Sequence, residues 1–178
     1  MRATRWIALA VMMGLALVAF ARPARACGVW HLTDHQRKVD VEYLIETASV
    51  RKAKRRIGVL YMVESPTGLR VTEGRRVVFD IVDGALRRRG KRVGTLGADG
   101  ALTIGARAYT IALTDPGTLH GMPSWHVEVK DGDTVIAAGD ASSLCAGMHR
   151  DPPMSEAEQQ DEIRRRVAYY LAWRQLGK

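Results

Sequence analysis

Alternating hydrophobic and polar positions run through the middle of the chain, over residues 76–140. Short alternations of this kind are typical of strands with one buried and one exposed face. Three Asp-Gly pairs punctuate them, and Asp-Gly favours hairpin turns because glycine tolerates positive φ. These pairs are Asp83-Gly84, Asp99-Gly100 and Asp131-Gly132. The pattern predicts a mainly β fold, an antiparallel meander of eight or nine short strands that forms a small barrel or sandwich.

The chain before the meander gives weaker signals. Residues 39–45 alternate and favour a strand, with a helix starting at Asp34 as the alternative. Residues 57–63 are apolar at both odd and even positions, which predicts a central strand covered on both faces. A basic turn is expected over 51–56, and residues 27–38 are expected to be irregular or a short helical turn.

The C-terminal residues 155–176 predict one amphipathic α-helix. Ser155 and Glu158 have the spacing of a capping box. Acidic residues crowd the first turns and arginines follow, as the helix dipole prefers. An apolar stripe lies in the second half, made of Ile163, Val167, Tyr170 and Leu171. We expect this stripe to pack on the sheet or to plug one mouth of the barrel.

Residues 1–26 have the pattern of an export signal. Arg2 and Arg5 precede 15 apolar residues, and Ala24-Arg25-Ala26 resembles a cleavage site. The apolar run is shorter than the roughly 20 residues of a membrane span. Residues 27–178 are therefore expected to form a single periplasmic or secreted β-rich domain with no membrane span. Loss of the four arginines of the signal lowers the net charge from +8 to +4.

The two cysteines, Cys27 and Cys145, predict one disulfide bond in an oxidising compartment. It would join the mature N-terminus to the segment after the last strand. The alternative is a lipid anchor on Cys27 as the first residue of a lipoprotein. That anchor would use the Cys27 sulfur and leave Cys145 free, so the two predictions exclude each other.

Candidate chemistry is sparse. The chain has no Gly-x-Ser-x-Gly and no Cys-x-x-Cys, so we expect a non-enzymatic protein without a cofactor. Histidines are the candidates for a metal site: His31 and His35 lie four apart, and the disulfide would bring His149 towards them. Copper would suit Met122 or Met148, because thioethers bind Cu(I).

Two features suggest a binding surface. The first is the pair of basic turns that contain Arg55 and Arg56 and, further on, Arg88 and Arg89. The second is a predicted loop over residues 115–124 and the two residues that follow it, because binding surfaces often lie on long loops. Its candidate contacts are Leu119, His120, Trp125 and His126.

The sequence therefore predicts an exported envelope protein that binds an anionic partner or ligand. The expected partners are an envelope protein, an anionic lipid or a polysaccharide. Nucleic acid is not expected, because neither basic turn has interleaved aromatic residues. The alternatives are a metal-binding periplasmic protein that uses the histidines, and a structural subunit of an envelope assembly that docks through the C-terminal helix.

Overall fold

The structure, a computed structural model, describes residues 30–44, 46–65, 68–97, 99–119, 122–142 and 154–177, with backbone alone at 64, 65, 68 and 69. The export signal, Cys27, Cys145, His120, Met148 and His149 lie outside the described residues. The cleaved signal, the disulfide and the lipid anchor on Cys27 therefore stay predictions. Within the described residues, no helix is both long and apolar enough to span a membrane.

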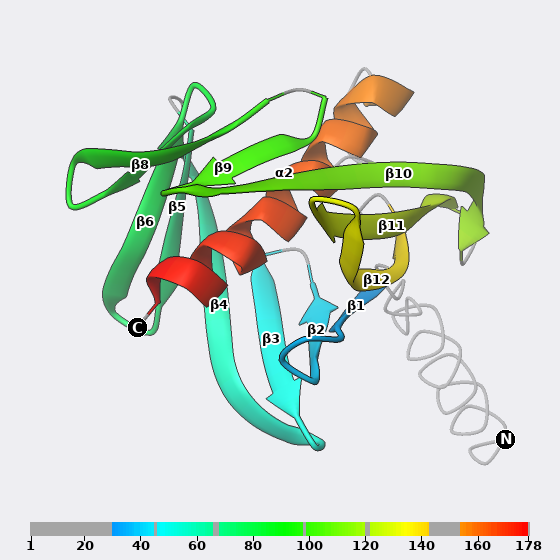
Figure 1. The fold of residues 1–178 in the computed structure, drawn as a ribbon, viewed down its shortest axis with the longest axis horizontal. Helices are drawn as coiled ribbons and strands as arrows, with labels where there is room; N and C mark the ends of the chain where they lie inside the picture. The colour runs from blue at the N-terminus through cyan, green and yellow to red at the C-terminus, as the bar shows by residue number, and fades with distance from the viewer. Residues whose placement is uncertain are drawn as a thin grey trace, which may run out of the picture.

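Twelve antiparallel strands of the described residues close into a barrel in chain order, with the first strand paired to the last. Every strand lies beside its sequence neighbours, so the barrel is one continuous meander (Figure 1). The mainly β prediction is confirmed. The strands are β1 (Trp30–Asp34), β2 (Val39–Tyr43), β3 (Thr47–Lys52), β4 (Arg55–Ser65), β5 (Gly68–Glu73), β6 (Arg76–Val82), β7 (Ala85–Arg88), β8 (Lys91–Leu96), β9 (Ala101–Ile104), β10 (Arg107–Leu119), β11 (Met122–Asp131) and β12 (Thr134–Ser142).

The C-terminal helix α2 (Glu156–Leu176) crosses the barrel interior (Figure 1). Its predicted capping box is present, with Ser155 accepting from the backbone N–H of Glu158. All residues from Arg166 to Ala172 are buried, which covers the full circumference of the helix. The expectation of a one-sided stripe is therefore wrong for this half, because strands surround it. The helix fills the interior of the barrel as part of its core.

The inward-facing strand residues form the rest of the core around α2. In β1, Trp30, Leu32 and Asp34 point inward, and in β2 the same alternation buries Val39, Val41 and Tyr43. Trp30 stacks on Tyr43 with ring centroids 3.8 Å apart. This strict alternation is what a barrel with a packed interior and a solvated outer wall requires.

Three of the strands, β1, β3 and β5, were not predicted. β1 replaces the expected irregular segment, so the helix predicted from Asp34 is absent from the described residues. β3 and the predicted β4 both extend into the expected basic turn, which is reduced to Ala53 and Lys54, both with positive φ. β5 was missed because Gly68–Glu73 is short and mixed in character.

Two further expectations are wrong. β4 is not covered on both faces, because Ile57, Tyr61 and Val63 point outward and are 45–56% exposed. The loop expected over residues 115–124 is a hairpin, since β10 and β11 continue pairing up to Leu119 and Met122. A bulge after Thr114, where Asp115 has a positive φ, bends this hairpin without ending it.

Candidate functional site

The hairpin turns alternate between the two ends of the barrel, because consecutive strands run in opposite directions. The β3–β4, β5–β6 and β7–β8 turns therefore share one end with the β1–β2, β9–β10 and β11–β12 turns. The C-terminal end of α2 also reaches this end and lies next to the β5–β6 turn (Figure 1). We name this end, with its turns and their flanking residues, the basic rim.

Exposed cations concentrate on the basic rim. Among the acids at the same end, Glu73 and Asp131 are in ion pairs with Arg76 and Arg107, and Asp133 in the β11–β12 turn is exposed. The exposed rim cations that have no ion-pair or hydrogen-bond partner within the described part of the chain are Lys38, Lys52, Lys54, Arg55, Arg56, Arg75, Arg89, Lys91 and Arg92. The rim therefore carries a large excess of positive charge.

The opposite end of the barrel is acidic. Glu46, Asp83 and Asp99 lie in its turns, and all three are exposed. The first turn of α2 adds Glu156 and Glu158 there, both exposed. Charge is thus separated along the barrel axis, and acids lie at the helix N-terminus and bases at its C-terminus, as the helix dipole favours.

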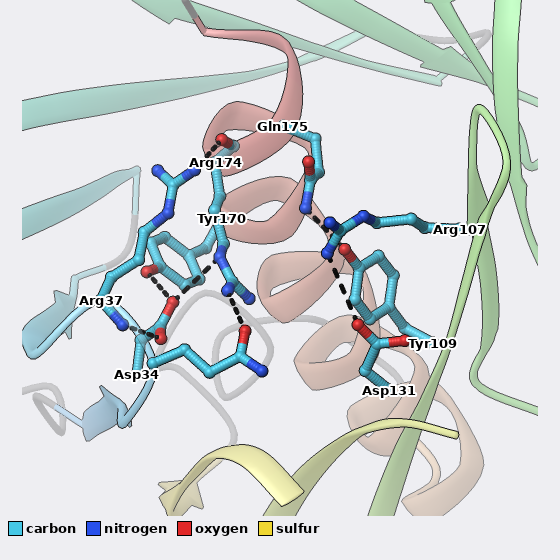
Figure 2. Close-up of polar contacts among 9 residues, drawn as sticks. Asp34, Arg37, Arg107, Tyr109, Asp131, Tyr170, Arg174 and Gln175 are labelled. Carbon is cyan, nitrogen blue, oxygen red and sulfur yellow. Dashed lines mark hydrogen bonds and ion pairs between the residues drawn. The ribbon is translucent and has the colours of Figure 1, made fainter. Parts of the chain in front are cut away.

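Two rim arginines bind the carbonyl groups that α2 leaves free at its end. Arg37 Nη2 donates to the Arg174 carbonyl oxygen at 2.7 Å (Figure 2). Arg76 Nη2 donates to the Gly177 carbonyl oxygen at 3.0 Å. Helix ends leave unsatisfied carbonyls with a partial negative charge, so these contacts fasten the helix to the rim.

A groove of about 690 Å³ opens at the rim between β8, β9 and the end of α2. Its polar contacts are Arg92, Gln175 and the threonine pair Thr95 and Thr103, whose hydroxyls lie 2.7 Å apart. Gln175 is held by a 2.6 Å hydrogen bond to the Tyr109 hydroxyl (Figure 2). The remaining lining residues are Val93, Gly94, Ile104, Gly105 and Leu176. The groove therefore combines a cation with hydroxyl and amide groups on a rigid wall.

A buried polar network lies below the rim and fixes the helix in the barrel. The Asp34 carboxylate has no exposed surface and accepts a 2.6 Å hydrogen bond from the Tyr170 hydroxyl. Arg174 Nε lies 3.2 Å from the same Asp34 oxygen, and Arg174 also donates to Gln36 at 2.6 Å (Figure 2). Burial, followed by the hydrogen bond to Asp34, raises the pKa of Tyr170.

A second buried pair holds the middle of the helix. Arg166 donates to Glu162 at 2.8 Å, and it also donates to the Leu44 carbonyl oxygen at 3.1 Å. Tyr43 lies fully buried in this part of the interior. Its burial, more than the nearby Tyr170, raises its pKa well above the ordinary tyrosine value.

The predicted binding residues fall into two groups. Arg55, Arg56, Arg88 and Arg89 all lie on the basic rim, because the β3–β4 and β7–β8 turns share one end. The residues of the predicted loop do not join them: Leu119 lies near the hairpin tip at the opposite end. Trp125 is a core residue, 4% exposed, and this burial excludes it from a surface contact.

His126 lies on the outer wall of the barrel, where Nδ1 is 2.9 Å from Asp140 Oδ1. His31 is also on this wall, since it is the β1 partner of Asp140. His35 follows β1 in an exposed turn. Among the described residues, no three His, Cys, Asp or Glu side chains are grouped to hold a metal ion. The proposed site with His149 reaches beyond the described residues and stays a prediction.

Sequence reasoning missed the residues that bind the helix to the rim. Asp34 was expected at the start of a possible helix and Arg174 as a favourable helix-end charge, yet they form a buried pair. Its position in the alternating pattern could have shown that Asp34 faces inward, since it follows the inward-facing Trp30 and Leu32 at every second residue. The groove residues carry no motif, because three separate elements supply them.

No protein-family model, curated protein or solved structure matches this chain.

Proposed function

We propose that the protein is an exported, non-catalytic binding protein that captures an anionic partner or ligand on the basic rim. The observation that carries the proposal is the gathering of unpaired, exposed cations from four neighbouring hairpin turns at one end of the barrel. Cations without ion-pair partners are free to bind carboxylate, sulfate or phosphate groups, and arginine can do so with two hydrogen bonds.

The filled interior supports a rim site over an interior one. Barrels that carry small ligands inside them keep their lumen open. Here α2 occupies the interior, and its side chains from Arg166 to Ala172 are buried against the strands. A ligand would therefore meet the outer surface, where the groove beside Arg92 and Gln175 offers a concave point of attachment.

The same helix bears on the alternative of a structural subunit that docks through its C-terminus. The apolar residues expected to meet a partner, Ile163, Val167, Tyr170 and Leu171, are buried in the protein's own barrel. Docking through them would require withdrawing the helix from the core. We therefore favour the rim as the contact surface.

The test is binding of a soluble polyanion, dextran sulfate, measured at a series of salt concentrations. We expect binding that weakens steeply between about 50 and 200 mM salt, because released counterions and screening oppose it. The variant Arg55→Gln/Arg56→Gln should weaken binding, and so should Arg89→Gln/Lys91→Gln at the other turn.

A matched control changes the net charge equally at a distance from the rim. The variant Thr114→Glu/Thr118→Glu places the two negative charges at exposed positions of β10, towards the opposite end. It should leave binding close to that of the unmodified protein. Binding that does not respond to salt, or that falls equally in the control, would refute the rim as the binding surface.

A further inference from the structure

The outer face of β4 is apolar over its whole central length. Its outward positions are Ile57, Val59, Tyr61 and Val63, and they alternate with the inward-facing Leu60 and Met62. Ile57 is 49% exposed, Tyr61 45% and Val63 56%. Single exposed apolar residues are normal on protein surfaces, whereas four successive outward positions form a continuous patch.

The strands on either side of β4 show that this is an exception in the barrel. Outward positions of β3 are Thr47, Ser49 and Arg51, and those of β5 include Arg70 and Thr72. Register adds one more apolar residue, since Tyr61 is opposite Thr72 and Thr72 is opposite Val77. Val77 is 47% exposed. We name Ile57, Val59, Tyr61, Val63 and Val77 the β4 strip.

The β4 strip explains the misleading pattern of the sequence. A strand that is apolar at both odd and even positions is expected where other parts of a protein cover both of its faces. The barrel interior covers one face of β4, while no described element of the chain covers the other. The pattern is thus consistent with a cover supplied by another molecule.

Unpaired cations adjoin the β4 strip at the rim. Arg56 is opposite the outward Arg51 and directly precedes Ile57, and Lys52 and Lys54 belong to the same hairpin. Arg75 lies in the β5–β6 turn, two residues before Val77. Of the outward acids on nearby strands, Glu42 and Asp80 are already in ion pairs with Arg51 and Arg70, and Asp40 accepts a hydrogen bond from Thr33. A second copy of the chain would therefore offer few free carboxylates to these cations from this wall.

We propose that the β4 strip and the adjoining cations dock the protein on an anionic lipid surface. This inference rests on the proposed function and names the partner as a phospholipid headgroup layer. Aliphatic side chains enter the boundary between headgroups and acyl chains, while lysine and arginine meet the lipid phosphates. Tyrosine is favoured at that depth because its ring is apolar and its hydroxyl is polar, which fits Tyr61 at the centre of the strip.

The test is cosedimentation of the protein, purified in the form that the cell accumulates, with lipid vesicles. Vesicles of phosphatidylglycerol mixed with phosphatidylethanolamine are compared with vesicles of phosphatidylcholine. We expect binding to the anionic vesicles and little to the neutral ones. The variant Ile57→Ser/Val63→Ser should weaken vesicle binding by roughly tenfold or more, because it removes two inserting side chains. Val77→Ser serves as an independent second variant with a smaller loss.

The control is Val135→Ser, which removes an exposed apolar side chain of β12, on a different part of the wall. It should leave vesicle binding unchanged. The strip variants should also keep full binding to dextran sulfate, since the rim cations are intact. Thermal unfolding of each variant checks that the barrel is folded.

The outcomes separate this inference from the proposed function. Dextran sulfate binding without vesicle binding, or vesicle binding that ignores Ile57→Ser/Val63→Ser, would overturn the lipid surface and leave the rim proposal standing. Absence of both kinds of binding would overturn both. A dimer in analytical ultracentrifugation that is lost in Ile57→Ser/Val63→Ser would identify a second copy as the cover and overturn the lipid surface.

Discussion

Tyr170 donates a 2.6 Å hydrogen bond to Asp34 and so joins the helix to the first strand across 136 positions of sequence. The acceptor has no exposed surface, and Arg174 lies 3.2 Å from the same oxygen. Buried charges are tolerated only when they are paired and hydrogen-bonded. The contact therefore fixes both the rotation and the depth of α2 inside the barrel.

The substitution Asp34→Asn should lower the free energy of unfolding by about 3–5 kcal/mol. The reason is that Arg174, 5% exposed, would keep a buried charge without a counterion. Guanidinium unfolding at neutral pH measures the change. Asp161→Asn, which breaks an exposed pair with Arg165, should cost at most about 0.5 kcal/mol. Equal effects of the two substitutions would contradict the role of Asp34.

Stability should fall as the pH rises above about 10, the ordinary pKa of tyrosine. The folded state raises the pKa of Tyr43 and Tyr170, so both stay protonated where the unfolded chain ionises. Their contribution to the free energy of unfolding is therefore complete below pH 10, and it is lost as the pH rises towards their raised pKa values in the folded state. Unfolding midpoints at pH 8, 10 and 11 test this, and Tyr170→Phe should show a shallower decline. Unfolding midpoints that do not change over this pH range would contradict the role of the two buried tyrosines.

Gly94→Ala should destabilise the protein by at least about 1–3 kcal/mol, because overpacking forces backbone shifts. A Cβ at this position would collide with the carbonyl oxygen of Thr103 in the paired strand β9, where no flexible side chain can yield. Gly117→Ala is the matched control, since its Cβ would meet atoms no closer than 3.6 Å. Thermal unfolding of the two variants compares them, and a larger loss in Gly117→Ala would show that the close approach is not decisive.

Leu171→Ala should cost about 2–5 kcal/mol, since Leu171 is fully buried where the helix meets the strands. Val63→Ala removes an apolar side chain that is 56% exposed, and it should change stability by no more than about 0.5 kcal/mol. Denaturant unfolding of both variants measures the contrast. If Leu171→Ala were as mild as Val63→Ala, the helix would not be part of the core.

The hairpins predicted from Asp-Gly pairs have glycine with positive φ at the turn. Asp83 and Gly84 both have positive φ, as the turn between β6 and β7 requires. The turn between β3 and β4 has the same geometry with Ala53 and Lys54, whose φ values are 49° and 67°. Neither residue favours that conformation, so the basic turn expected over 51–56 was not expected to be a tight two-residue hairpin turn. Tertiary pairing of the flanking strands imposes the turn, and this is why β3 was missed.

The position of the helix could not be predicted from its pattern for a related reason. Charged residues normally mark the solvent face of a helix, and Glu162, Arg166 and Arg174 suggested one here. All three are buried, because Arg166 pairs with Glu162 and Arg174 pairs with Asp34. Pairing between distant residues makes these charges compatible with the interior, and a single sequence does not show such pairs.

The basic rim was predictable in outline. Consecutive strands run in opposite directions, so two turns lie at the same end of the barrel when an even number of strands separates them. The two basic turns are separated by four strands, β4 to β7. The missed strand β5 lies between them, so that number was wrong at the sequence level. The groove beside Arg92 depends on the end of α2, and its position follows only from the buried pairs that hold the helix.

The helix that fills the barrel comes after all of the strands in chain order. Until it arrives, the inward side chains of twelve strands have no partner at their centre, and a wall built around them would enclose an empty space. Closure of the packed barrel must therefore wait for the segment from Glu156 to Leu176. We therefore expect a chain cut before Glu156 not to form the packed barrel, however complete its strands are.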